Sequence, residues 1–265
     1  MLKFSPANVK IQALSQVSDI APFLANKRKV YSFDLLSGFS CPHAHDCLSK
    51  AIADASGRRS IQDGPDTQFR CFSASQEVVY TNVYKQRKAN FDTLRACKNS
   101  SEMFRMIEAA LPKNAGVIRI HVAGDFFKQD YFDAWLAVAL VRPDVLFYAY
   151  TKSLPYWVAR QKDIPANFVL TASRGGRRDD LIEANGLRSV KVVFSETEAK
   201  AAGLEIDHTD EHAANPATRA NDFALLIHGV QPKGSTAADA IKVLKKNGVQ
   251  FAYSRTKKEG AKSVT

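Results

Sequence analysis

Four cysteines are the side chains in this sequence best suited to chemistry. Cys41 and Cys47 lie in the turn-prone stretch GFSCPHAHDC at residues 38–47, with five residues between them. Cys71 and Cys97 follow after gaps of 23 and 25 residues. Thiolates are soft ligands, and four of them can hold zinc or an iron–sulfur cluster. The sequence therefore predicts a metal centre whose ligands are Cys41, Cys47, Cys71 and Cys97.

The spacing of these cysteines favours a cluster over zinc. Structural zinc sites are typically built from two close pairs of ligands, and here the one close pair is wider than usual. Ligands spread over several elements suit an iron–sulfur cluster held in a pocket of the fold. We therefore predict a 4Fe–4S cluster, with zinc as the alternative. His43 and His45 could replace a thiolate, and four buried thiols without any metal are the plain structural explanation.

Composition places this site in a globular protein. Apolar residues make up 45% of the 265 positions, and no apolar run approaches the roughly 20 residues of a membrane helix. The first residues lack the apolar core of a secretory signal, so we expect a cytoplasmic protein with no membrane partner. In that compartment four cysteines favour metal ligation over disulfides.

The chain carries a formal net charge of +10. Such a balance predicts attraction to nucleic acid or another polyanion. The basic residues are spread over several short clusters instead of one helix, and ordinary surface solvation also explains them.

The elements that must position the cysteines come first in the chain. Residues 1–29 show helical apolar spacing and predict a lead-in or cap. A strand at 30–36 feeds the first cysteine loop, and residues 47–53 predict a short helix. Residues 56–66 are polar and turn-rich, which predicts an exposed loop. A short strand at 69–72 and helices over 76–94 and 103–111 complete this region.

A regular alternation of strand and helix begins at Gly116. Strands are predicted at 117–122, 145–151, 168–173, 190–195, 223–229 and 249–253, with helical segments between them. Strands that are apolar along their whole length and alternate with helices indicate a parallel sheet covered by helices. We predict a single α/β domain over 1–265. Its architecture is a partial or open (β/α) barrel with a cysteine-bearing region at 30–115, β/α units at 116–255 and a loose tail at 256–265. A doubly wound sheet is the alternative.

Polar side chains recur where these strands end. In parallel α/β folds, ligands bind beyond the carboxyl ends of the strands. His121, Asp125, Tyr150, Lys152 and Arg174 all occupy such positions, and we predict that they form one cofactor-binding mouth. Each also has an ordinary structural explanation, such as helix capping by Asp125.

Several motifs resemble a known family. The stretches GFSCPHA at 38–44, RIHVAGDF at 119–126 and FYAYTKS at 147–153, with Tyr131 and Trp135 between them, are similar to those of the phage "gene product 88" family. The resemblance covers roughly residues 30–230. The family is largely uncharacterised, so the resemblance implies a viral or prophage origin and a place in the host bacterial cytoplasm more than a reaction.

A looser resemblance is to the partial barrels of radical S-adenosylmethionine enzymes, although this sequence lacks their C-x3-C-x2-C motif. Three hypotheses follow. The first is an iron–sulfur protein that acts in electron transfer, redox sensing or structure. The others are a cluster-dependent enzyme of the radical S-adenosylmethionine type and a zinc-containing nucleic-acid-binding protein.

Overall fold

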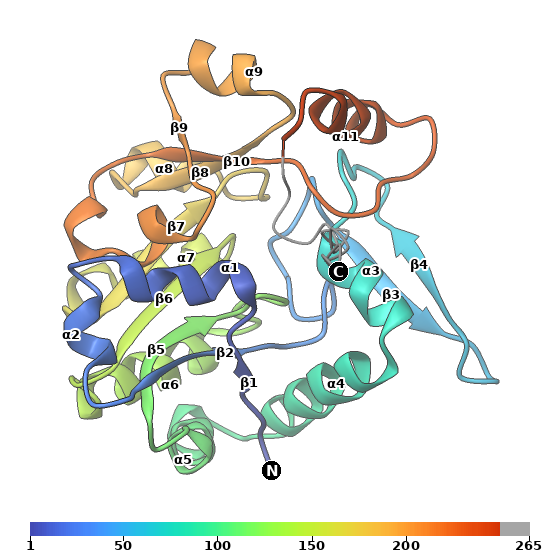
Figure 1. Ribbon diagram of the computed structural model, residues 1–265. Helices are drawn as coiled ribbons and strands as arrows, with labels where there is room; N and C mark the ends of the chain where they lie inside the picture. The colour runs from blue at the N-terminus through green and yellow to red at the C-terminus, as the bar shows by residue number, and fades with distance from the viewer. Residues whose placement is uncertain (250–265) are drawn as a thin grey trace, which may run out of the picture.

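The computed structural model describes residues 1–249, and a mostly parallel eight-stranded sheet lies at its centre (Figure 1). The strand order is β1-β2-β5-β6-β7-β8-β10-β9. β1 pairs with β2 in antiparallel fashion, and the other pairs in this sheet are parallel. Its strands are β1 (Ser5–Pro6), β2 (Lys29–Phe33), β5 (Ala115–Ile120), β6 (Leu146–Thr151), β7 (Phe168–Ser173), β8 (Ser189–Val193), β9 (Glu205–Ile206) and β10 (Phe223–Leu226).

Helices connect most of these strands. The α-helices are α1 (Val9–Gln12), α2 (Ala21–Leu24), α3 (Phe72–Val79), α4 (Thr81–Arg95), α5 (Ser100–Ala110), α6 (Gln129–Val141), α7 (Leu154–Val158), α8 (Asp180–Ala184), α9 (Glu196–Ala201), α10 (Glu211–Ala214) and α11 (Thr236–Lys246). Three 3₁₀ turns, η1 (Ala13–Gln16), η2 (Gln161–Asp163) and η3 (Pro216–Thr218), complete the described chain.

The sheet is buried on both faces because its strands carry apolar side chains in both directions. All six residues of β5 are buried. Successive side chains of a strand point to opposite faces. Ile118 accordingly joins one core with Trp135 of α6, whereas Val117 joins a second core with Leu14 of η1. The predicted lead-in at 1–29 is thus a cover for one face, and α1 and α2 lie across that face in Figure 1.

Residues 47–66 differ from the prediction of a helix followed by a loop. They form a hairpin of β3 (Ser49–Ala53) and β4 (Arg59–Asp63), which projects from the molecule in Figure 1. Along β3, Ser49 and Ala51 are buried while their neighbours are more exposed. This alternation has the period of a strand that packs one face. The pattern is too short and too poor in large apolar residues to be recognised from sequence.

Residues 69–94 also differ from their prediction. Cys71 is the N-cap of α3 instead of a strand residue, and the one predicted helix is two. The break falls at Tyr80, whose backbone is extended (φ −106°, ψ 101°). This break turns α4 away from α3, so that Cys71 and Cys97 lie at opposite ends of a bent pair of helices.

The prediction of an α/β fold with a largely parallel sheet is confirmed. Except for Val249, the last predicted strand at 249–253 lies outside the described residues, as does the tail at 256–265. Within residues 1–249, no helix is long and apolar enough to cross a membrane.

Candidate metal and ligand site

A cavity of about 590 Å³ opens beyond the carboxyl ends of the parallel strands. Its wall includes residues that follow β5, end β6 and β7, and belong to β10, together with the loop after β2 and the start of α3. Pockets of this volume are typical of small-molecule sites. The position at the strand ends is the one that ligands occupy in most parallel α/β folds.

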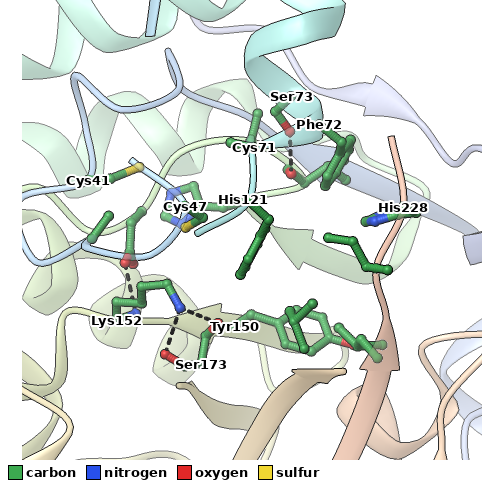
Figure 2. Close-up of a pocket in the computed structure, with 18 of the residues that line it drawn as sticks. Cys41, Cys47, Cys71, Phe72, Ser73, His121, Tyr150, Lys152, Ser173 and His228 are labelled. Carbon is green, nitrogen blue, oxygen red and sulfur yellow. Dashed lines mark hydrogen bonds between the residues drawn. The ribbon is translucent and has the colours of Figure 1, made fainter. Parts of the chain in front are cut away.

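Three of the four cysteines line this cavity. Cys41 and Cys47 come from the loop after β2, and Cys71 is at the N-terminus of α3. Figure 2 shows the three along one side of the cavity, with Tyr150 and Ser173 across from them. The cysteine loop is held in place by backbone contacts with residues 175–176, because the Asp46 N–H donates to the Gly175 carbonyl (3.0 Å) and Ala44 pairs with Gly176.

Burial raises the pKa of all three cavity thiols. The pKa of Cys71 is raised to about 11, first by burial and then by the nearby Cys47. The pKa of Cys41 is raised well above its usual value by burial, by Asp125 and by the other two thiols. Burial raises the pKa of Cys47 as well, although the positive charge of Lys152 opposes the shift. Without a cation these groups are thiols, and a bound metal would supply the positive charge that thiolates need.

Cys97 lies outside the cavity, in the core between α4 and α5. It is 6% exposed, and its Sγ lies 3.5 Å from the Thr93 carbonyl oxygen and 3.5 Å from Met106 Sδ. Three of the four predicted ligands therefore line one cavity, and the fourth, Cys97, is packed in the core at the end of α4.

Asp125 is a buried carboxylate beside Cys41 and Cys47. Its Oδ1 accepts hydrogen bonds from Thr151 Oγ1 (2.6 Å) and the Phe126 N–H (2.7 Å), and its Oδ2 accepts from the Lys152 N–H (2.9 Å). Burial nevertheless raises its pKa to about 6, because the loss of water outweighs these three bonds. Gly124 allows this turn, since a Cβ there would lie 2.6 Å from Ser40 Oγ.

Lys152 is buried and fully engaged with oxygen acceptors. Its Nζ donates to the carbonyl and the hydroxyl of Ser173, both at 2.9 Å, and to the Arg174 carbonyl. These bonds fix a positive charge at the cavity wall near Cys47 (Figure 2).

His121 lines the cavity in an uncommon backbone conformation. Its φ is +71°, in the left-handed region that non-glycine residues seldom adopt. Its Nε2 lies 3.0 Å from the Tyr131 hydroxyl, whereas Nδ1 has no hydrogen-bond partner among the described residues. Burial, with a smaller contribution from Arg119, lowers its pKa to about 3, so the imidazole is neutral at physiological pH. Such strained backbone is frequently found at functional sites.

Tyr150 also lines the cavity, while Arg174 does not. The Arg174 Nε donates to Ser189 Oγ (2.9 Å), and its guanidinium pairs with Glu183 of α8 (2.8 Å). Of the five residues predicted to share one mouth, His121, Asp125, Tyr150 and Lys152 line the cavity. The side chain of Arg174 turns toward the neighbouring helix, where an acidic residue compensates its charge.

Sequence reasoning missed the floor of the cavity. Arg119, the second-last residue of β5, forms an ion pair with Asp210 and lies over the Tyr150 ring (5.1 Å to the centroid). The hydroxyls of Tyr148 and Tyr150 donate to Asp210 at 3.1 and 3.4 Å. A charged residue inside an apolar strand was the available signal for Arg119. Asp210 does not directly follow any of the apolar stretches that predict strands, so the sequence did not indicate that it belongs to the site.

Within residues 1–249, no group of three or more His, Cys, Asp or Glu side chains is arranged to hold a single metal ion. The thiols of Cys41, Cys47 and Cys71 are the side chains in the cavity wall with the soft donor atoms that iron–sulfur clusters use. A cluster does not require the three sulfur atoms to approach one another as closely as a single metal ion does, because each thiolate binds a different iron.

The fold and the cavity define an α/β protein with a ligand-sized, cysteine-lined pocket at the carboxyl ends of its strands. Comparison with family models gives a match to "Gene product 88" over residues 7–246, so the chain belongs to the gene product 88 family. Neither the curated proteins nor the solved structures contain a match.

Proposed function

We propose that this protein binds a [4Fe–4S] cluster through Cys41, Cys47 and Cys71, in the cytoplasm of an infected bacterium, and uses the adjoining cavity to bind a small molecule. The observation that carries the proposal is that three cysteines from two distant segments line one ligand-sized cavity while the fourth lies in the core. This set replaces the four-cysteine site expected from the sequence. With these three thiolates, a [4Fe–4S] cluster would have one iron without a cysteine ligand.

The sheet supports this proposal through its strand order. From β2 to β10 the parallel strands follow one another in chain order, without the reversal that marks a doubly wound sheet. We interpret the sheet as a partial (β/α) barrel that remains open at β9. In such a fold, loops from successive strands converge over one mouth, which suits a site assembled from the loop after β2 and the N-terminus of α3.

The surrounding residues suit a negatively charged group at the thiols. Lys152 holds a fixed positive charge near Cys47, which favours the thiolate form. Lys152 is itself buried, and its partial removal from water strengthens that attraction. Asp125 opposes it as a carboxylate, but its raised pKa eases protonation, which would remove the repulsion.

The test is anaerobic purification or reconstitution of the full chain, followed by iron and acid-labile sulfide analysis. We expect a brown protein with about four iron and four sulfide per chain, the content of one such cluster. Cys41→Ser, Cys47→Ser and Cys71→Ser should each lose most of the iron. Cys97→Ser is the matched control and should keep it.

Three outcomes would contradict the proposal. A colourless protein with one zinc and no sulfide would favour the zinc alternative. Full iron content in two of the three cavity variants would remove the shared site. Loss of iron in Cys97→Ser, with unchanged folding by circular dichroism, would restore the four-cysteine ligand set.

A second candidate function, cleavage of S-adenosylmethionine, is favoured by the three-thiolate arrangement. If Cys41, Cys47 and Cys71 held a reduced [4Fe–4S] cluster, it would supply one electron to S-adenosylmethionine, which would split into methionine and a 5′-deoxyadenosyl radical. The radical becomes 5′-deoxyadenosine by taking a hydrogen atom from a substrate or, where none is added, from the components of the reducing buffer. The cavity provides the room, and Asp125 and Lys152 provide charges of both signs beside it. Dithionite-reduced protein given S-adenosylmethionine should then form 5′-deoxyadenosine. An unchanged cofactor would leave electron transfer, redox sensing or a structural role.

A further inference from the structure

The end of the cavity formed by the segment between β9 and α10 carries a buried carboxylate with one oxygen that accepts no hydrogen bond from residues 1–249. Asp207 lines the cavity and is 4% exposed. Its Oδ1 accepts a hydrogen bond from the Thr209 N–H (2.9 Å). Its Oδ2 has no hydrogen-bond partner among residues 1–249. A buried charge left in this way is costly unless a ligand supplies the missing donor.

Arg188 lies near enough to Asp207 to interact with it electrostatically, but Oδ2 of Asp207 accepts no hydrogen bond from it. Arg119 is paired with Asp210. Arg188 donates to the carbonyls of His212 (2.6 Å) and Ala213 (3.2 Å) and to the Thr171 hydroxyl. Arg188 balances part of the Asp207 charge, and its own Nε has no hydrogen-bond partner among residues 1–249. Within the same residues, Oδ2 of Asp207 remains an acceptor for a donor from outside the chain.

The rest of the cavity near this end is apolar and aromatic. Leu225, Ile227 and the Tyr150 ring line it, and Phe72 packs against His228 with 4.6 Å between the ring centroids (Figure 2). Apolar walls around one acidic group suit a ligand with an apolar body and a cationic head. The aromatic faces add to this preference, because cations are attracted to aromatic rings.

We propose that the cavity binds small molecules that have an aromatic or aliphatic body and a protonated primary amine, with the ammonium group on Asp207. The ammonium would donate to Oδ2 in a charge-assisted hydrogen bond, which is among the strongest a buried carboxylate can accept. This inference rests on the proposed function in that it assigns a substrate class to the same cavity.

A second polar atom of the cavity wall, Nδ1 of His121, also has no hydrogen-bond partner among residues 1–249 and offers a contact for another part of the ligand. His121 is 3% exposed, lines the same cavity and has a free Nδ1. A neutral imidazole can donate or accept there, according to its tautomer. A hydroxyl, amide or ring nitrogen on the ligand would satisfy it, so the preferred ligands are amines that carry one further polar group.

The test compares three probes of the same shape on the full-length protein by isothermal titration calorimetry. Benzylammonium carries the proposed charge, benzyl alcohol is its neutral counterpart and benzoate reverses the sign. We expect saturable binding of benzylammonium at least about tenfold tighter than that of benzyl alcohol, and no measurable binding of benzoate. Equal binding of the alcohol, tighter binding of benzoate, or no binding of benzylammonium would overturn the inference.

Variants then assign the binding to Asp207. Asp207→Asn should weaken benzylammonium by about tenfold or more, since it keeps the shape and removes the charge. Glu205→Gln is the matched control, because Glu205 lies two residues away, outside the cavity and exposed to solvent, and it should bind as the wild type does. Unchanged affinity in Asp207→Asn would contradict the assignment. If that variant melts early, the comparison of probes on the wild-type protein decides alone.

The measurement reads ligand affinity and not iron, so its result is separable from that of the cluster. Amine binding by protein without iron would support the inference even if the cluster proposal failed. A protein with full iron and sulfide content that binds no benzylammonium would retain the cluster and lose the substrate class.

Discussion

Cys97 and Cys71 carry the same type of side chain in two different surroundings. Cys97 is buried and Cys71 is half-buried, and the partial loss of water raises the pKa of each. Cys97 lies in the core against Met106 and the Thr93 carbonyl. Cys71 lies at the start of α3, in a cavity wall that also holds two more thiols, a carboxylate and a lysine.

The difference shows that a raised pKa does not distinguish a metal ligand from a packed core thiol. The surroundings do, because chemistry requires room for a second molecule. Cys71 borders the cavity, whereas Cys97 is packed in the core, although Lys128 lies near enough to Cys97 to oppose the rise of its pKa. Variants at these and neighbouring positions test this contrast. Each measurement uses protein without metal, so its result does not depend on whether a cluster binds.

The largest expected effect comes from placing asparagine at each of the two positions. Cys97→Asn puts a polar amide into the core with few partners, which should lower the free energy of unfolding by about 2–3 kcal/mol. Cys71→Asn should change it by less than about 1 kcal/mol, because asparagine is a favourable N-cap and Cys71 has an extended backbone at that position. Urea unfolding measures both. Equal losses at the two sites would erase the contrast.

The next effect concerns the pH dependence of the cavity wall, where two groups have opposite signs. The folded pKa of His121, about 3, lies below its unfolded value, so the unfolded state takes up protons first and stability falls as pH drops below about 6.5. The folded pKa of Asp125, about 6, lies above its unfolded value, so stability rises as pH drops through 6 toward about 4. In the wild type the two contributions largely offset each other between pH 7 and pH 5.

Single variants separate these contributions. Relative to the wild type, Asp125→Asn should lose about 1 kcal/mol more stability between pH 7 and pH 5, because the effect of His121 is then unopposed. His121→Asn, which tolerates the left-handed backbone, should shift the same difference by about 2 kcal/mol in the other direction. Urea titrations at the two pH values measure both. A shift of the same sign in both variants would show that one of the two pKa directions is wrong.

The smallest effect is expected at the surface. The chain carries a net charge of +10, and we expect weak binding to duplex DNA without sequence preference. Affinity should fall steeply between about 50 and 200 mM salt, because phosphate contacts release counterions. Cys71→Ser should bind as the wild type does, since it leaves every lysine and arginine in place. If the protein does not bind DNA at about 50 mM salt, its net positive charge serves only to keep the surface solvated.

Much of the scaffold could be predicted from the sequence. Apolar stretches such as residues 117–122 and 168–173 determine β5 and β7, because strands covered on both faces must be apolar throughout. The same alternation placed His121, Asp125, Tyr150 and Lys152 at strand ends, where the cavity lies. These inferences depend on local patterns, which one sequence contains in full.

Tertiary structure alone decided which cysteines meet and what closes the cavity. Cys71 joins Cys41 and Cys47 because the 49–63 hairpin returns the chain to the mouth, and Cys97 is carried away because the helix bends at Tyr80. Asp207 and Asp210 reach the floor from a loop with no periodic signal, and Asp210 meets Arg119 across 91 positions. Such contacts depend on how elements pack and not on the order of neighbouring residues, so the sequence determined the sheet and its rim while packing determined the site.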